Sequence, residues 1–298
     1  MYGYRYHIIT CISVFLALGL GLLLGGTFGE QVIVKEQVQL LDRLEDRYTQ
    51  AKAENVKLKQ ESVDLDTKGR QLLHVVSQVS DHYVQDRLPG KKVAILQLEP
   101  TELSALLTTL EKAGANVTST TLITNSRLLY DPAGLSELGK GMAHAEGVTA
   151  QERQQRLLEG VVDSLYREGS DSTLLTELQE KQALTVNGTV AQAPDALILI
   201  GGAGDENRQR LLSLDVPLLK VLQSRGLTVV GTEPSEAAHS GVRYYREHGV
   251  STVDNVDQTT GLVALIDVLG GAKGHFGVKK TAEALLPKLT NAKEVSAQ

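Results

Sequence analysis

Residues 8–28 read IITCISVFLALGLGLLLGGTF, a stretch of 21 residues without one charged side chain. A helix needs about 20 apolar residues to cross the hydrocarbon core of a bilayer, so the stretch predicts a transmembrane helix. The alternative is a cleaved secretory signal, and small residues do crowd the end of the run. However, the apolar region of such a signal usually spans only about 7–15 residues. We therefore expect an uncleaved membrane anchor.

The residues on either side of this stretch predict its orientation. Arg5 and the amino terminus precede it, whereas the first charges after it are Glu30, Lys35 and Glu36. By the positive-inside rule, residues 1–7 form a cytoplasmic tail and residues 30–298 lie outside the cytoplasm. The sequence thus predicts a single-pass protein of the cell membrane with an extracytoplasmic C-terminal domain.

Small residues recur every four positions along the apolar stretch, at Ala17, Gly21, Gly25 and Gly29. This spacing places them on one helix face, where a second backbone can approach closely. Glycine is in any case more frequent in membrane helices than in soluble ones, which is the alternative explanation. We expect these four residues to form a dimerisation face.

Residues 30–88 contain no proline and fit one heptad register. The a positions are Val34, Leu41, Tyr48, Asn55, Ser62, Gly69, Val76 and Tyr83, and the d positions are Gln37, Leu44, Ala51, Leu58, Leu65, Leu72, Val79 and Asp86. Eleven of these sixteen positions are apolar, which predicts a coiled-coil stalk that ends at Pro89. Asn55 at an a position favours two strands, and a shared membrane favours a parallel homodimer. The alternative is a single helix folded back on the soluble domain.

Residues 91–291 alternate short apolar runs with helical stretches. The runs lie at 93–98, 116–123, 195–202, 227–232 and 250–256, and the helices are expected at 101–113, 217–225, 259–269 and 281–289. Such alternation is typical of βαβ units, and it predicts a Rossmann-like, parallel, three-layer α/β domain. Residues 127–190 interrupt this alternation and predict a helical insertion, which contains a capping box formed by Thr149 and Glu152. Residues 292–298 are expected to form a flexible tail.

Acidic residues follow four of the five predicted strands. They are Glu99, Asp205, Glu233 and Asp254, and Asp257 extends the set. Because the carboxyl ends of parallel strands meet at one edge of the sheet, these residues are candidates for a site that binds Mg²⁺ or Ca²⁺. The alternative is that each carboxylate caps a helix and faces water.

Two glycine-rich loops are candidate binding loops. Gly201, Gly202 and Gly204 follow the third predicted strand, but residue 207 is Asn, so the dinucleotide-binding pattern fails and a tight turn is expected. The second loop contains Gly274, His275 and Gly277. The sequence is equally consistent with a contact surface and with a flexible connector to the last helix.

Composition excludes several classes of protein. The formal net charge is −6 and no basic cluster offsets it, which argues against a nucleic-acid partner. The single cysteine, Cys11, excludes an intramolecular disulfide and any zinc site built from thiolates. The seven histidines are scattered, and motifs of nucleophilic or zinc hydrolases are absent from the sequence. We identify no cofactor and expect that the protein is not an enzyme.

The opening YRYHIITCISVFLALGLGLLLGG, at residues 4–26, together with the heptad pattern, resembles the MctB copper-transporter family of Gram-positive and actinobacterial envelopes. Residues 250–271, VSTVDNVDQTTGLVALIDVLGG, and the GHFG that follows resemble the closing part of that family. The resemblance implies copper transport or copper homeostasis in the cell envelope. It names no copper ligands in this chain. Copper prefers thiolate, thioether and imidazole groups, but outside the predicted span the sequence has no cysteine, only two methionines (Met1 and Met142) and scattered histidines.

Three functional hypotheses follow from the sequence. The first is an envelope protein with an indirect role in copper transport or homeostasis, as the resemblance implies. The second is a structural scaffold or regulator, whose dimeric stalk presents α/β heads to an envelope partner in the cell wall or division machinery. The third is an extracytoplasmic enzyme that uses the acidic residues and a metal ion.

Overall fold

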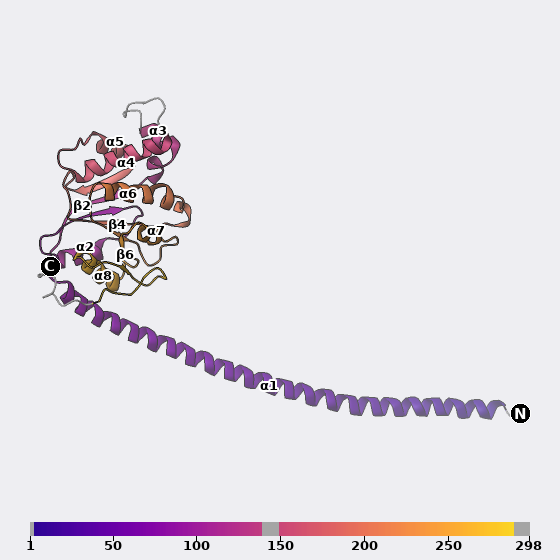
Figure 1. The fold of residues 1–298 in the computed structure, drawn as a ribbon. Helices are drawn as coiled ribbons and strands as arrows, with labels where there is room; N and C mark the ends of the chain where they lie inside the picture. Colours follow the sequence, from indigo (N-terminus) through magenta and orange to yellow (C-terminus); the bar gives the residue numbers. More distant parts are fainter. Residues whose placement is uncertain (1–2, 139–148, 289–298) are drawn as a thin grey trace. The chain divides into compact units, whose positions relative to one another are not determined.

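The computed structural model describes residues 3–138 and 149–288, and within these ranges the side chains of residues 27–37 and 206 are left undescribed. The predicted tail at 292–298 therefore lies outside the described residues. The chain divides into two compact units, Met1–Leu73 and His74–Gln298. The helix α1, Gly3–Val84, belongs to both units (Figure 1).

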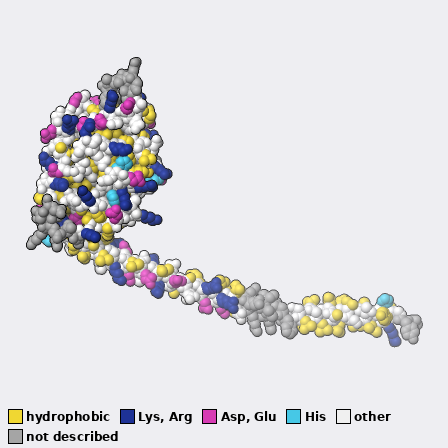
Figure 2. Space-filling view, in the orientation of Figure 1, with side chains coloured by type: hydrophobic (Ala, Val, Ile, Leu, Met, Phe, Trp, Pro, Cys, Tyr) yellow, Lys and Arg dark blue, Asp and Glu magenta, His cyan; other side chains and the backbone are white. Residues whose placement is uncertain are grey.

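The described part of the first unit is the segment of α1 up to Leu73. Its segment Gly3–Gly26 is the one helix of the described chain that is long and apolar enough to cross a membrane, with a mean hydropathy of 2.5. The structure buries none of this segment (Figure 2). The helix continues past the apolar stretch without a break, because residues 30–84 contain neither a proline nor a glycine cluster that would end it.

The end of α1 differs from the prediction. The helix ends at Val84 and not at Leu88, and Asp86 adopts a positive φ of 55° in the turn that follows. Leu88 then packs into the core of the second unit. The predicted stalk at 30–88 is therefore four residues too long, and its last d position, Asp86, is not helical.

The second unit contains a seven-stranded sheet with the order β3-β2-β1-β4-β5-β6-β7. Every strand pair is parallel except β2 and β3, which are antiparallel. The strands are β1 Lys92–Gln97, β2 Asn116–Ile123, β3 Leu184–Gly188, β4 Ala196–Ile200, β5 Val229–Thr232, β6 Ser251–Val253 and β7 His275–Phe276. The five predicted strands are confirmed, and the two edge strands β3 and β7 are additional.

Helices cover both faces of this sheet (Figure 1). The last turn of α1, α2 Ser104–Lys112 and α8 Thr259–Leu269 pack on one face. On the other face lie α3 Pro132–Leu138, α4 Ala150–Tyr166, α5 Thr173–Glu180, α6 Val216–Ser224 and α7 Val242–Glu247. A π-helical turn, Leu211–Asp215, leads directly into α6. The result is the three-layer α/β arrangement that the sequence predicts.

The central strands explain why both faces are covered. In β1, Val93 and Ile95 point into the core beneath α2 and α8, whereas Ala94 and Leu96 point into the core beneath α4 and α6. Successive side chains of a strand face opposite sides, so a continuously apolar strand needs a packed layer on each side. All five residues of β4, ALILI, are buried for the same reason.

The insertion at 127–190 is only partly helical. It contains α3, α4 and α5, and the predicted capping box is present, since the Thr149 hydroxyl accepts from the amide of Glu152. It then returns to the sheet as β3, which pairs with β2. The helix predicted at 281–289 is wrong over the described residues 281–288, which form turns. Gly277 N–H donates to Ala284 O at 3.0 Å, and this bond holds the segment in a non-helical course.

Candidate functional site

The carboxyl edge of the sheet carries the four predicted acidic residues, each directly or shortly after its strand. Glu99 follows β1, Asp205 follows β4, Glu233 follows β5 and Asp254 follows β6. Their surroundings, however, differ from one residue to the next. The groups that contact a carboxylate decide whether it can bind anything else.

Arg210 lies at the ends of β1 and β4 and is only 1% exposed. Its guanidinium donates to Glu99 Oε2 at 2.5 Å, to Asp215 Oδ1 at 3.1 Å and to the carbonyl oxygens of Leu98 and Gly202. These four acceptors surround a side chain that could not otherwise be buried, since an unpaired buried charge is strongly disfavoured. We call Arg210 with these partners the Arg210 network.

The Arg210 network extends to Tyr245, whose hydroxyl donates to Asp215 Oδ2 at 3.1 Å. Burial raises the pKa of Asp215, and the neighbouring Arg210 partly opposes this shift. Burial and the adjacent Asp215 carboxylate raise the pKa of Tyr245 well above its ordinary value. The network occupies the space between the ends of β1 and β4. This is the topological switch point of the sheet, the place where open α/β sheets usually bind their ligands.

Glu233 is fully buried and forms the second site. Lys279 Nζ donates to its Oε1 at 2.6 Å, and the Ser240 hydroxyl donates to the same oxygen at 2.7 Å. The amides of Gly241 and Val242 donate to Oε2 at 2.7 and 3.3 Å. The carboxylate therefore joins the loop after β5 to the segment after β7.

Asp254 is 1% exposed and binds backbone amides. Its carboxylate accepts from Val278 N–H at 2.7 Å and from Lys279 N–H at 3.1 Å. Gly277 allows this approach, because a Cβ at that position would lie 2.0 Å from Asp254 Oδ1. The glycine also has φ = +138°, a conformation that other residues rarely adopt.

Asp205 lies apart from these sites and is the most exposed of the four, with a side chain that is 90% exposed. Its Oδ1 lies 2.9 Å from His239 Nε2. Asp257, the fifth predicted acidic residue, accepts from the amide and hydroxyl of Ser235 at 2.7 and 2.6 Å. Within residues 3–138 and 149–288, no three His, Cys, Asp or Glu side chains form a group that could hold a metal ion.

The loop Gly201–Gly204, where a tight turn is expected, leads from β4 to a 3-10 helix at Asp205–Asn207, and Ala203 within it forms an isolated antiparallel bridge with His239. A Cβ on Gly201 would lie 1.9 Å from the hydroxyl of Tyr245, and Gly202 has φ = +79°. The amides of Gly201 and Ala203 donate to Thr232 O and His239 O. With these amides bonded within the protein, the loop does not present a row of free N–H groups to a phosphate.

The second glycine-rich loop contributes to the sheet. His275 and Phe276 form β7, which pairs with β6, and Gly274 and Gly277 flank it with positive φ angles of 141° and 138°. The Thr252 hydroxyl and His275 Nδ1 lie 3.0 Å apart. Burial lowers the pKa of His275. This segment is therefore an edge strand, which replaces the predicted connector to a final helix.

The predicted dimerisation residues lie on exposed parts of α1. Nothing lies within 4 Å of the Cβ positions of Gly21 and Gly25, and Ala17 is exposed; Gly29 lies outside the described side chains. Asn55 is exposed. The apolar seam is exposed at Leu41 (67%), Leu44 (58%), Leu58 (59%), Leu65 (68%) and Leu72 (65%).

A contact that sequence reasoning missed fixes the end of α1 within the second unit. Arg87 donates to Asp267 Oδ1 at 2.7 Å and stacks over the Tyr83 ring at 3.8 Å. The Tyr83 hydroxyl also donates to Asp267, which lies on α8. Burial is the main cause that raises the pKa of both Asp267 and Tyr83. The partners are 180 or more residues apart in the sequence, so no local pattern connects them.

Comparison with known proteins assigns a family. The model of the family described as "Copper transport outer membrane protein, MctB" matches residues 1–287. This match agrees with the resemblance of the N-terminal and C-terminal segments. No curated protein matches the chain.

Proposed function

This chain belongs to the MctB family, and on that premise we propose that it acts in copper transport or homeostasis at the cell envelope, anchored by its N-terminal helix. The observation that carries the proposal is the family match, which covers residues 1–287. The apolar segment Gly3–Gly26 supports a single-pass anchor. The flanking charges favour a cytoplasmic N-terminus and an extracytoplasmic head.

We propose further that the role in copper is indirect. Copper prefers thiolate, thioether and imidazole ligands. The single cysteine lies inside the apolar segment, and the described residues contain no cluster of three metal-binding side chains. One transmembrane helix also cannot enclose a polar pathway by itself. In this proposal, another protein transports copper across the membrane, and this chain assists that protein.

We propose that two copies pair in parallel through α1. The support is the exposed seam of leucines between Leu41 and Leu72, which would cost free energy if it stayed in water. Exposed apolar stripes of this length usually mark an interaction surface. The heptad spacing matches a two-stranded coiled coil, in which Asn55 would fix the register. A Rossmann-like class for the head is part of the same proposal, supported by the parallel strands β2-β1-β4-β5-β6.

A structural scaffold that presents the heads to an envelope protein is the second candidate. The exposed seam favours it, because a long paired helix suits a spacer better than a catalyst. We also propose that the chain is not an enzyme. Glu99, Glu233 and Asp254 each accept short bonds from the chain's own groups, which leaves them little capacity to bind a catalytic metal.

The test combines cells and purified protein. Cells that lack the chain are compared with the parent strain for copper content and for growth across a copper series, with zinc as the control metal. We expect copper content and copper tolerance to change, zinc content to stay the same, and the full-length gene to restore the parent values. Unchanged copper content and tolerance would refute the copper role.

The indirect role is tested separately on the full-length protein in detergent. Cu(I) is titrated in competition with a chromogenic chelator, and we expect the protein to remove no stoichiometric equivalent from it. Removal of one equivalent per chain would refute the indirect role while leaving the copper role in place. Affinity purification from membranes, with and without added copper, then distinguishes a copper-dependent partner from a constitutive scaffold partner.

A further inference from the structure

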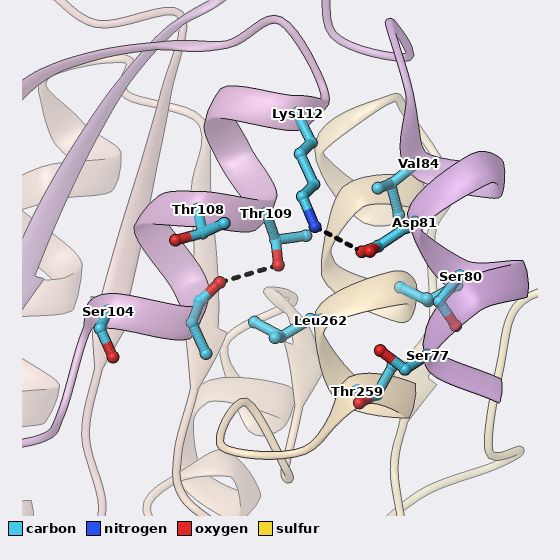
Figure 3. A pocket seen from close by; sticks show the side chains of 12 residues that line it. Ser77, Ser80, Asp81, Val84, Ser104, Thr108, Thr109, Lys112, Thr259 and Leu262 are labelled. Atoms are coloured by element: carbon cyan, nitrogen blue, oxygen red, sulfur yellow. Dashed lines mark hydrogen bonds and ion pairs between the residues drawn. The ribbon is translucent and has the colours of Figure 1, made fainter. Parts of the chain in front are cut away.

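A groove lies between α1, α2 and α8 on one face of the second unit, and it belongs to none of the networks at the carboxyl edge of the sheet (Figure 3). Its volume is about 340 Å³, at the small end of the range of roughly 300–1,000 Å³ that is typical of ligand sites. Its three walls are the last turns of α1, one face of α2 and the first turn of α8.

The groove is lined by hydroxyl groups. Five of them make no hydrogen bond within the protein, and all five belong to described residues: Ser77, Ser80, Ser104, Thr108 and Thr259. The sixth, on Thr109, donates to the carbonyl of Ala105 at 2.8 Å. Thr67 and Ser136 make the same kind of bond to a backbone carbonyl elsewhere in the chain. The groove therefore presents five hydroxyls whose donors and acceptors are unused within the protein.

The charges in the groove cancel. Lys112 Nζ and Asp81 Oδ1 form an ion pair of 2.8 Å between α2 and α1 (Figure 3). An anionic ligand would meet Asp81 and a cationic ligand would meet Lys112, so neither sign of charge is favoured. Between the polar groups, Val84, Leu262 and Val263 provide a nearly buried apolar surface.

We propose that this groove binds a neutral saccharide. Each free hydroxyl can both donate and accept, as sugar hydroxyls do, so the pairing can be reciprocal along the ligand. Val84 and Leu262, which are 2% and 7% exposed, add only a small apolar area, so the hydroxyl groups define the ligand. A peptide would be recognised by an unpaired strand edge or by deeper apolar pockets, and the helical walls of this groove offer neither. The site is independent of the copper role proposed above.

The groove also gives saccharide binding a mechanical consequence. Ser77 and Ser80 lie on the last turns of α1, while Thr108 lies on α2 and Thr259 on α8. A ligand that bonds all three helices would stabilise the attachment of the α1 end to the rest of the second unit. Because a ligand that binds only the folded state raises its stability, the saccharide should raise the melting temperature of that unit.

The experiment uses the full-length chain in a phosphocholine detergent, because detergents with sugar head groups would compete for the groove. The probes are maltotriose, cellotriose and chitotriose, with a hyaluronan tetrasaccharide as the charged comparator. Binding is measured by calorimetric titration and by the shift in melting temperature. We expect at least one neutral probe to bind saturably and the charged comparator to bind more weakly.

The matched variants are Thr108→Val and Thr109→Val, which remove neighbouring hydroxyls from the same groove. The Thr108 hydroxyl is free to donate and to accept, whereas that of Thr109 already donates to Ala105 O and can only accept. Thr108→Val should therefore weaken binding more than Thr109→Val, by about threefold to tenfold for one hydrogen bond. The double variant Ser77→Ala/Thr108→Val should weaken it by about tenfold or more.

Three results would overturn the proposal. The first is that none of the three neutral probes saturates the protein at concentrations up to about 10 mM, which corresponds to a binding free energy near −3 kcal/mol. The second is that Thr108→Val and Thr109→Val bind the best probe with equal affinity. The third is preferential binding of the charged comparator or of an extended peptide tested in parallel.

Discussion

Replacing Arg210 with methionine tests the central electrostatic contact of the head. The substitution keeps a long side chain of similar reach but removes the charge and all of its donors. Asp215, which is fully buried, then loses its cationic partner, and the carbonyls of Leu98 and Gly202 lose a donor. Removing one partner of a buried ion pair costs about 3–5 kcal/mol. For a unit of this size that is a fall in melting temperature of roughly 6–20 °C.

The expected loss depends on pH, and its sign follows from Asp215. Burial already raises the pKa of this carboxyl above its ordinary value of 3.8, and the charge of Arg210 opposes that rise. Without Arg210 the pKa in the folded state rises further. The folded variant then holds a proton that the unfolded chain releases, so its stability falls as pH rises through the window above 3.8. We therefore expect a smaller loss at pH 5 than at pH 7.5.

The assay follows thermal unfolding of the full-length protein in detergent by the near-ultraviolet circular dichroism of tyrosine. The chain has no tryptophan, and five of its nine tyrosines lie at position 83 or beyond, so this signal reports mainly on the head. Far-ultraviolet dichroism would be dominated by the 82-residue helix α1.

The matched control is Arg243→Met. Arg243 is 69% exposed and pairs with Glu247 at 3.4 Å one helical turn away, so its loss should cost no more than about 0.5 kcal/mol. A double variant, Arg210→Met/Asp215→Asn, removes the abandoned charge and should recover part of the loss at pH 7.5. The reasoning is refuted if Arg210→Met resembles Arg243→Met, or if its loss is equal at the two pH values.

Three further outcomes test other contacts. Gly277→Ala should destabilise the head by about 2 kcal/mol or more, measured by the same melting assay, because its Cβ would lie 2.0 Å from Asp254 at φ = +138°. Asp254→Ala should remove that clash, so the double variant should be less unstable than the sum of the two single variants, and simple additivity would contradict the contact. Leu65→Asp should weaken self-association in sedimentation experiments by at least about tenfold. The reason is that burying a leucine side chain in the seam contributes about 1.5–3 kcal/mol of free energy. Val63→Asp, at a position off the seam that is also exposed, is its control, and equal losses in the two variants would count against the coiled coil.

The central strands were predictable because their sequences are continuously apolar, which requires burial on both faces of the sheet. A run such as ALILI, apolar at every position, is stable only between two packed layers, which already implies a three-layer domain. The capping box at Thr149 and the bounds of α8 were predictable for a similar reason, because local chemistry decides where a helix begins and ends.

The missed elements depend on contacts that the local sequence does not contain. The edge strand β3 has one buried residue in five, and β7 is two residues long, so neither shows a strand pattern of its own. The helix predicted at 281–289 is not formed over the described residues 281–288. Pro287 already disfavours a helix at the residue before it, and the bonds from 277 and 283 to other segments decide the local course.

The candidate site shows the same division. The sequence placed Glu99, Glu233 and Asp254 correctly at the carboxyl ends of their strands. It could not show that the side chains of Arg210 and Lys279 pair with Glu99 and Glu233, because these partners lie 111 and 46 residues apart along the chain. Strand ends position a carboxylate, but the loops that return over them decide whether it is free.

The last turns of α1 show how one helix can serve two interfaces. Val79 is 64% exposed and fits the proposed seam, whereas Val84, five residues later, is 2% exposed in the core of the head. Tyr83 occupies an a position in the heptad register, yet its hydroxyl bonds Asp267 on α8. A seam between two copies therefore has to end by Val79, because the next turn already packs against its own head. The boundary between the proposed seam and the head is thus set by the packing of Tyr83 and Val84, and not by the proline at position 89, which lies beyond the helix.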